Sequence, residues 1–117
     1  MKINEEQKTN LRTAIEISII ANNFAMKAQK IVVRTVKNYV KDAEAMFRDI
    51  ESDINIYECE NREYRKLYEG LESGRTDGLN ICMLSGCKHM LENGEIDKGT
   101  ASKLIKSIDE VLNQIND

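Results

Sequence analysis

Five cationic residues are the part of this sequence whose types and spacing are best suited to binding chemistry. They lie within residues 24–41, a segment that contains five bases and no acid. Successive steps of three and four residues place all of them on one face of an α-helix. A row of cations along about 20 Å of exposed helix attracts phosphate groups or an acidic protein surface. The predicted binding residues are Lys27, Lys30, Arg34, Lys37 and Lys41.

The acids that follow this basic row allow two further interpretations of it. Residues 42–72 contain ten acids and four bases, so a basic block is followed by an acidic one. The row is then either a solvated surface or is neutralised by acids of the next helix. The candidate partners for such pairing are Asp42, Glu44, Glu58, Glu60 and Glu63. A net charge of −3 and the lack of interleaved aromatic residues favour an acidic protein over nucleic acid as an external partner.

Three cysteines and one histidine are the residues from which a metal site or a nucleophilic site would be built. The spacing Cys82-x4-Cys87-x-His89, with Cys59 elsewhere, differs from that of structural zinc sites, whose cysteines are typically two to four residues apart. Cys82 and Cys87 fall instead on the apolar stripe of a predicted helix, so we expect buried thiols and an exposed His89. No metal or cofactor is expected. The odd number of cysteines indicates reduced thiols in a cytoplasm.

Two pairs of glutamates, Glu60-x-x-Glu63 and Glu92-x-x-Glu95, are the carboxylates that could hold a divalent cation. Their spacing resembles that of all-helical nucleotide pyrophosphohydrolases, which hold magnesium with acids at positions i and i+3 of facing helices. The second pair spans Asn93-Gly94, a predicted helix end, so its members are not expected to share a helical face. The sequence also contains no phosphate-binding glycine loop and no dinucleotide fingerprint. A non-catalytic protein is therefore expected.

The element that must position the basic row is a long N-terminal helix. All six glycines lie at residue 70 or later, and the chain has no proline. Asn4 is the predicted N-cap with Gln7 in the capping-box position, and the apolar periodicity continues across Asn22 and Asn23. We therefore expect an unbroken, straight helix from about residue 4 to residue 51. Its buried stripe is predicted to contain Ala14, Ile17, Ala21, Phe24, Ala28, Val32, Val36, Tyr39, Ala43, Met46 and Ile50.

Polar and glycine-containing segments divide the rest of the chain into shorter helices. The segment Ser52-Asp53-Ile54-Asn55 is expected to end the long helix, which gives a second helix over about residues 56–72. A helical hairpin is expected over about residues 77–115, with its first helix ending at Asn93-Gly94 and its second capped by Asp97. The sequence thus predicts an all-α helical bundle that forms a single domain over residues 1–117.

The length of the first helix is the reason to expect self-association. A helix over residues 4–51 is roughly 70 Å long, whereas a compact chain of this size is about 35–40 Å across. The helix must therefore bend back near Asn22 or Ser52, or pair with a second copy. We expect pairing, as a homodimer formed by a coiled coil along the long helix.

The function expected from these features is protein binding without catalysis. No apolar run is long enough for a membrane span or for the apolar region of a signal peptide, which indicates a cytoplasmic protein. The small size, the Lys-, Asn-, Ile- and Glu-rich composition and the lack of catalytic groups resemble those of phage and mobile-element accessory proteins. That resemblance implies an inhibitor or regulator that occupies an acidic surface of a host or defence protein. Nucleic-acid or nucleotide binding through the same basic row is the alternative.

Overall fold

The protein is an all-α helical bundle with a long N-terminal helix, as the sequence predicts. The computed structural model describes residues 2–39, 44–73 and 79–116. The helices in these ranges are α1 (Glu5–Tyr39), α2 (Glu44–Gly70), α3 (Ile81–Asn93) and α4 (Lys98–Asn116), with a 3-10 turn, η1 (Leu71–Ser73), after α2. No described helix is long and apolar enough to cross a membrane.

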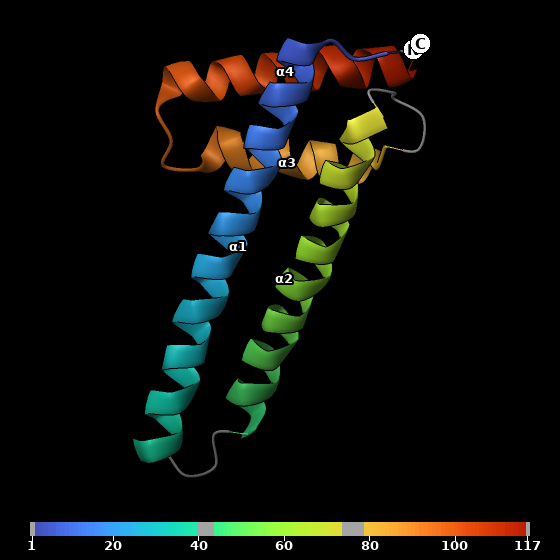
Figure 1. Ribbon diagram of the computed structural model, residues 1–117. Helices are drawn as coiled ribbons and strands as arrows, with labels where there is room; N and C mark the ends of the chain where they lie inside the picture. Colours follow the sequence, from blue (N-terminus) through green and yellow to red (C-terminus); the bar gives the residue numbers. More distant parts are fainter. Residues whose placement is uncertain (1, 40–43, 74–78, 117) are drawn as a thin grey trace.

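Two regions of the molecule differ in how many helices they contain (Figure 1). Helices α1 and α2 run antiparallel, and α3 and α4 cross them near the N-terminal end of α1. We call the four-helix end the base, and we call the two-helix extension, residues 20–39 and 44–62, the arm. The molecule measures 56 × 29 × 20 Å, and its radius of gyration of 17.0 Å exceeds the value of about 13 Å for a compact chain of this length.

Local capping signals fix several helix ends as the sequence predicts. Asn4 and Gln7 form a reciprocal capping box, in which each backbone N–H donates to the side-chain oxygen of the other residue, at 3.1 and 2.7 Å. The Asp97 carboxylate accepts a hydrogen bond from the Thr100 backbone N–H at 3.0 Å and thereby starts α4. For α3 the observed N-cap is Asn80, whose side chain accepts from the Met83 N–H, and the predicted end at Asn93 is confirmed.

The predicted end of the first helix is wrong. Helix α1 ends at Tyr39, and the segment 52–55 that was expected to break it lies inside α2. Ser52, Asp53 and Asn55 are exposed, so their polar side chains are accommodated on the solvent side of a continuous helix. Each such residue lowers helix propensity by only about 0.5 kcal/mol, which packing of α2 on α1 outweighs. The continuity predicted across Asn22 and Asn23 is confirmed.

Three asparagine side chains link α1 and α2 where the base meets the arm. Asn22 Nδ2 donates to Asn61 Oδ1 at 3.0 Å, and Asn61 Nδ2 donates to Asn23 Oδ1 at 3.1 Å. The Asn61 side chain is buried, with 2% of its surface exposed. A buried amide that is satisfied in one alignment of the two helices opposes sliding of one helix along the other.

The apolar core lies almost entirely in the base. It draws on all four helices and includes Leu11, Ile15, Leu67, Leu71, Leu84, Cys87, Leu91, Leu104, Ile108 and Val111. In the described part of the arm, by contrast, only Met26 and Asn61 are buried. Because α2 folds back along α1, the chain itself covers one side of its long helix. The geometric argument for a homodimer is thereby removed, and the homodimer stays a prediction.

Candidate functional site

The described members of the predicted basic row lie together on the arm. Lys27, Lys30, Arg34 and Lys37 are all exposed residues of α1, at the spacing expected for one helical face. Lys41, the fifth predicted member, lies outside the described residues. The structure therefore keeps four of the five predicted cations on one continuous helix and presents them to solvent.

Acids of α2 do not neutralise this row within the described part of the chain. Glu60 accepts a hydrogen bond from Asn22 at 3.3 Å, and Glu63 pairs with Lys66 at 3.2 Å. No described ion pair includes a cation of the row; Asp42 and the side chain of Glu44 lie outside the described residues. The ammonium group of Lys37 lies 5.7 Å from the centroid of the Phe47 ring, which is a cation–π contact.

An apolar strip lies beside the basic row, and here the sequence prediction needs correction. Phe24, Ala28 and Val32 were expected to be buried, but all three are exposed, Phe24 by 72% and Val32 by 45%. Ile20 and Ile31 add to the same surface at 55% and 52%. The reason is that α3 and α4 cover only the first half of α1 (Figure 1). The apolar stripe of α1 therefore extends beyond the helices that bury it.

The two groups of residues form adjoining strips along α1. At about 100° per residue, the apolar positions cover one part of the solvent side and the cations cover the adjoining part. The opposite side, with buried Met26 and half-buried Gln29 and Val33, faces α2, and Gln29 donates to Asp53 at 3.4 Å. We call the two strips together the arm face. Its apolar strip is Ile20, Phe24, Ala28, Ile31 and Val32, and its basic strip is Lys27, Lys30, Arg34 and Lys37.

The arm face contains two shallow depressions. One of about 380 Å³ is lined by Asn23, Met26, Lys27, Lys30, Ile31 and Arg34. The other, of about 270 Å³, is lined by Ile20, Asn23, Phe24 and Lys27. Each depression has both apolar and cationic side chains at its edge. Such a surface can receive apolar side chains while placing cations next to acids of the same partner.

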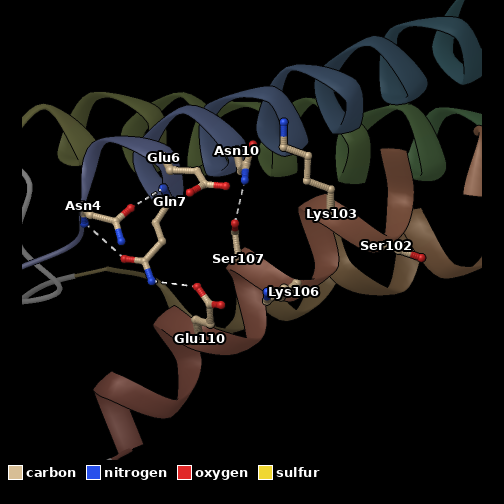
Figure 2. A pocket seen from close by; sticks show the side chains of 9 residues that line it. All are labelled: Asn4, Glu6, Gln7, Asn10, Ser102, Lys103, Lys106, Ser107 and Glu110. Carbon is tan, nitrogen blue, oxygen red and sulfur yellow. Dashed lines mark hydrogen bonds between the residues drawn. The ribbon is translucent and has the colours of Figure 1, made fainter. Parts of the chain in front are cut away.

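A polar depression of about 400 Å³ lies in the base (Figure 2). Gln7 Nε2 donates to Glu110 Oε2 at 2.9 Å, and Asn10 Nδ2 donates to Ser107 Oγ at 2.7 Å. Gln7, Asn10 and Ser107 are buried. These two hydrogen bonds each join α1 to α4. Their evident role is to hold α4 on α1.

The three cysteines differ in exposure, because Cys59 and Cys82 are exposed and Cys87 lies in the core. Cys87 is fully buried, as predicted, with its sulfur 3.3 Å from Ser18 Oγ. Burial raises the pKa of the Cys87 thiol, and hydrogen bonds from Ser18 and Tyr64 offset part of that change. The expectation that Cys82 is buried is wrong, because this residue lies on the solvent side of α3. His89 is exposed, as predicted.

The second glutamate pair, Glu92 and Glu95, has the geometry that the sequence predicts. Glu92 is the last residue but one of α3, and Glu95 follows the end of that helix, so the pair does not share a helical face. Among the described residues, no group of three or more His, Cys, Asp or Glu side chains is placed to hold a metal ion.

No protein-family model matches the chain, and no curated protein or solved structure is significantly similar to it.

The sequence reasoning missed the exposed apolar strip and the buried asparagine. The strip had a signal, because its residues were recognised as apolar, but their exposure depends on how far α3 and α4 reach along α1. The burial of Asn61 had no local sequence signal, because the residues next to an asparagine in a helix do not show whether its side chain is buried or exposed.

Proposed function

We propose that the protein is a non-catalytic protein-binding module that binds its partner through the arm face. The observation that carries this proposal is the combination of four cations that form no ion pair with any described residue and an adjoining apolar strip that includes Phe24 at 72% exposure. Contiguous exposed apolar side chains are unfavourable in water and commonly mark interaction surfaces. Apolar contact supplies affinity, and the cations select an acidic partner.

Charge supports a protein partner over nucleic acid. Residues 44–63 of α2 contain seven acids and two bases, so the helix beside the basic strip is strongly acidic. An extended phosphate backbone that followed the basic strip would be repelled by this neighbour. The apolar strip would also have no role in phosphate binding. Nucleic-acid or nucleotide binding remains the second candidate because the cations of the basic strip have no intramolecular ion-pair partner among the described residues.

The proposed activity is regulation by occupation of another protein's surface. The composition, which resembles that of phage and mobile-element accessory proteins, supports a host or defence protein as the target. The free cysteines of the structure fit a reducing compartment, so we place the activity in the cytoplasm.

Affinity capture from a bacterial lysate tests this function when it is done with matched variants. The test variant carries Lys27→Glu, Lys30→Glu and Arg34→Glu. The control carries Lys98→Glu, Lys103→Glu and Lys106→Glu, which change the net charge equally at exposed residues of α4. We expect specific proteins to be captured by the wild type and the control and lost from the test variant. Equal capture by all three proteins would contradict the proposal.

Salt dependence separates the two candidate functions. Four phosphate contacts predict a loss of affinity on the order of 100-fold between about 50 and 200 mM salt. Binding that depends mainly on the apolar strip predicts a much smaller loss. A steep loss, together with nuclease-sensitive capture, would favour the nucleic-acid candidate.

A further inference from the structure

We infer that the segment bound by the arm face is an amphipathic α-helix of another protein, with acidic residues along one edge of its apolar stripe. This inference rests on the proposed function and specifies the partner. Its first support is the geometry of the arm face, whose apolar and basic residues form two adjoining strips along α1. A second helix repeats its side chains in parallel lines at the same spacing, so the two sets can interdigitate.

Charge fixes the second property of the partner helix. The basic strip contains four cations and no acid, and it borders only one side of the apolar strip. A partner helix that packs its apolar stripe on Phe24 and Ile31 therefore brings one of its edges against Lys27 and Arg34. Acids on that edge would be attracted to both cations, whereas bases there would be repelled.

The width of the available surface argues against a broad anionic partner. The arm face lies on a single helix, which is about 10–12 Å wide with its side chains. Beside it, α2 exposes Asp49, Glu51, Asp53 and Glu58. A flat anionic bilayer or a nucleic-acid duplex is wide enough to approach these acids as well as the basic strip. A single helix can lie on α1 alone.

A second copy of this chain fits the arm face less well than a foreign helix. Its acidic helix, α2, has Ile56 as its one large exposed apolar side chain among the described residues, so it would leave the apolar strip largely uncovered. Antiparallel pairing of two α1 helices through their apolar strips would place both basic strips on the same side of the pair. Repulsion between like charges opposes that arrangement.

Selection from a displayed peptide library tests the inference without knowledge of the partner. The library holds random peptides of about 16 residues, or roughly 24 Å of helix. It is selected on the wild type after depletion on the Phe24→Ser variant. We expect the enriched peptides to place apolar residues at helical spacing with Asp or Glu beside them. A synthetic peptide from this set should become helical on binding, as measured by circular dichroism.

Charge exchange then tests the predicted edge contact. By fluorescence anisotropy, Phe24→Ser or the pair Lys27→Glu and Arg34→Glu should weaken binding of the peptide about tenfold or more. The control pair Lys103→Glu and Lys106→Glu should leave the affinity unchanged. Replacing the acids of the peptide by lysine should restore binding to the Lys27→Glu and Arg34→Glu variant and weaken binding to the wild type.

Several results would overturn the inference. One is enrichment of proline-rich or basic peptides, and another is the lack of any enrichment that depends on Phe24. A third is binding through the arm face to phosphatidylserine vesicles or to a DNA duplex, with no binding of peptides. A wild-type dimer in light scattering that Phe24→Ser makes monomeric would assign the face to a second copy. Face-dependent capture of proteins from the lysate without helix selection would retain the proposed function and reject only the helix. If neither protein capture nor helix selection depends on the arm face, the proposed function and the helix inference are both rejected.

Discussion

At the scale of single residues, Asn61 has the clearest structural role. Its buried amide donates to Asn23 and accepts from Asn22, so α1 and α2 satisfy these groups in one alignment. The Asn61→Ala variant removes both hydrogen bonds and should lower the free energy of unfolding by about 1–3 kcal/mol. Urea denaturation measures this change. The exposed control Asn55→Ala should alter stability by no more than about 0.5 kcal/mol, and equal losses in both variants would contradict the assigned role.

Tyr64 predicts how stability depends on pH. Burial raises the pKa of Tyr64 to about 12 from 10.0, and the nearby Cys87 and Glu60 add to this change. The folded state therefore favours the neutral phenol, so its contribution is complete below pH 10 and is lost as the pH rises from 10 through 12. The loss amounts to about 2–3 kcal/mol. Tyr64→Phe should show a smaller loss than the wild type in urea denaturation over this range, and parallel profiles would contradict the prediction.

At the scale of elements, the signals that could be predicted from the sequence are the local ones. The capping box of Asn4 and Gln7, the cap at Asp97 and the helix end at Asn93 each depend on residues a few positions apart. The end of α1 at Tyr39 has no comparable signal, since residues 40–43 contain neither glycine nor proline. The position of that end is therefore not readable from a local pattern.

For the candidate site, the sequence predicted which residues share a helical face but did not predict which apolar residues are exposed. Helical spacing correctly placed Lys27, Lys30, Arg34 and Lys37 on a solvent-exposed face. The same spacing correctly grouped Phe24 with other apolar residues but could not show that the group is uncovered. A periodic pattern identifies which residues share a face of a helix, whereas the exposure of that face depends on the lengths and crossing positions of the other helices.

Continuity of α2 through the segment 52–55 gives an element-scale prediction. Ser52 and Asn55 lie at exposed interior positions of this helix, so replacement of both by alanine should stabilise the protein by about 1 kcal/mol. Asp53 is left unchanged because it accepts a hydrogen bond from Gln29. Thermal denaturation measures the change. Destabilisation by the double substitution would indicate that these residues cap a helix end instead of occupying a helix interior.

At the scale of the whole molecule, the fold combines a well-packed base with a thinly packed arm. All but two of the buried residues of the described chain lie outside the arm. We expect amide hydrogen exchange, followed by mass spectrometry, to be faster in residues 20–37 and 47–60 than in the helices of the base. Addition of a partner that occupies the arm face should slow exchange in α1. Equal protection of arm and base in the free protein would contradict this division.

The elongated shape makes the arm face available along its full length. In the arm, α1 packs only on α2, and Ile20, Phe24, Ile31 and Val32 are exposed, whereas in the base α3 and α4 also lie against α1 (Figure 1). A partner helix on the arm face would therefore continue, by intermolecular contact, the packing that α3 and α4 provide within the chain.

The central claim, that Phe24 contacts another protein, is tested most directly by site-specific photocrosslinking. The photoreactive residue p-benzoylphenylalanine replaces Phe24 or, as a control, the exposed Asn113 of α4, and each protein is irradiated in a bacterial lysate. The account predicts a discrete adduct with a different protein from position 24 and none from position 113. No adduct from position 24, the same adducts from both positions, or an adduct with nucleic acid would contradict it.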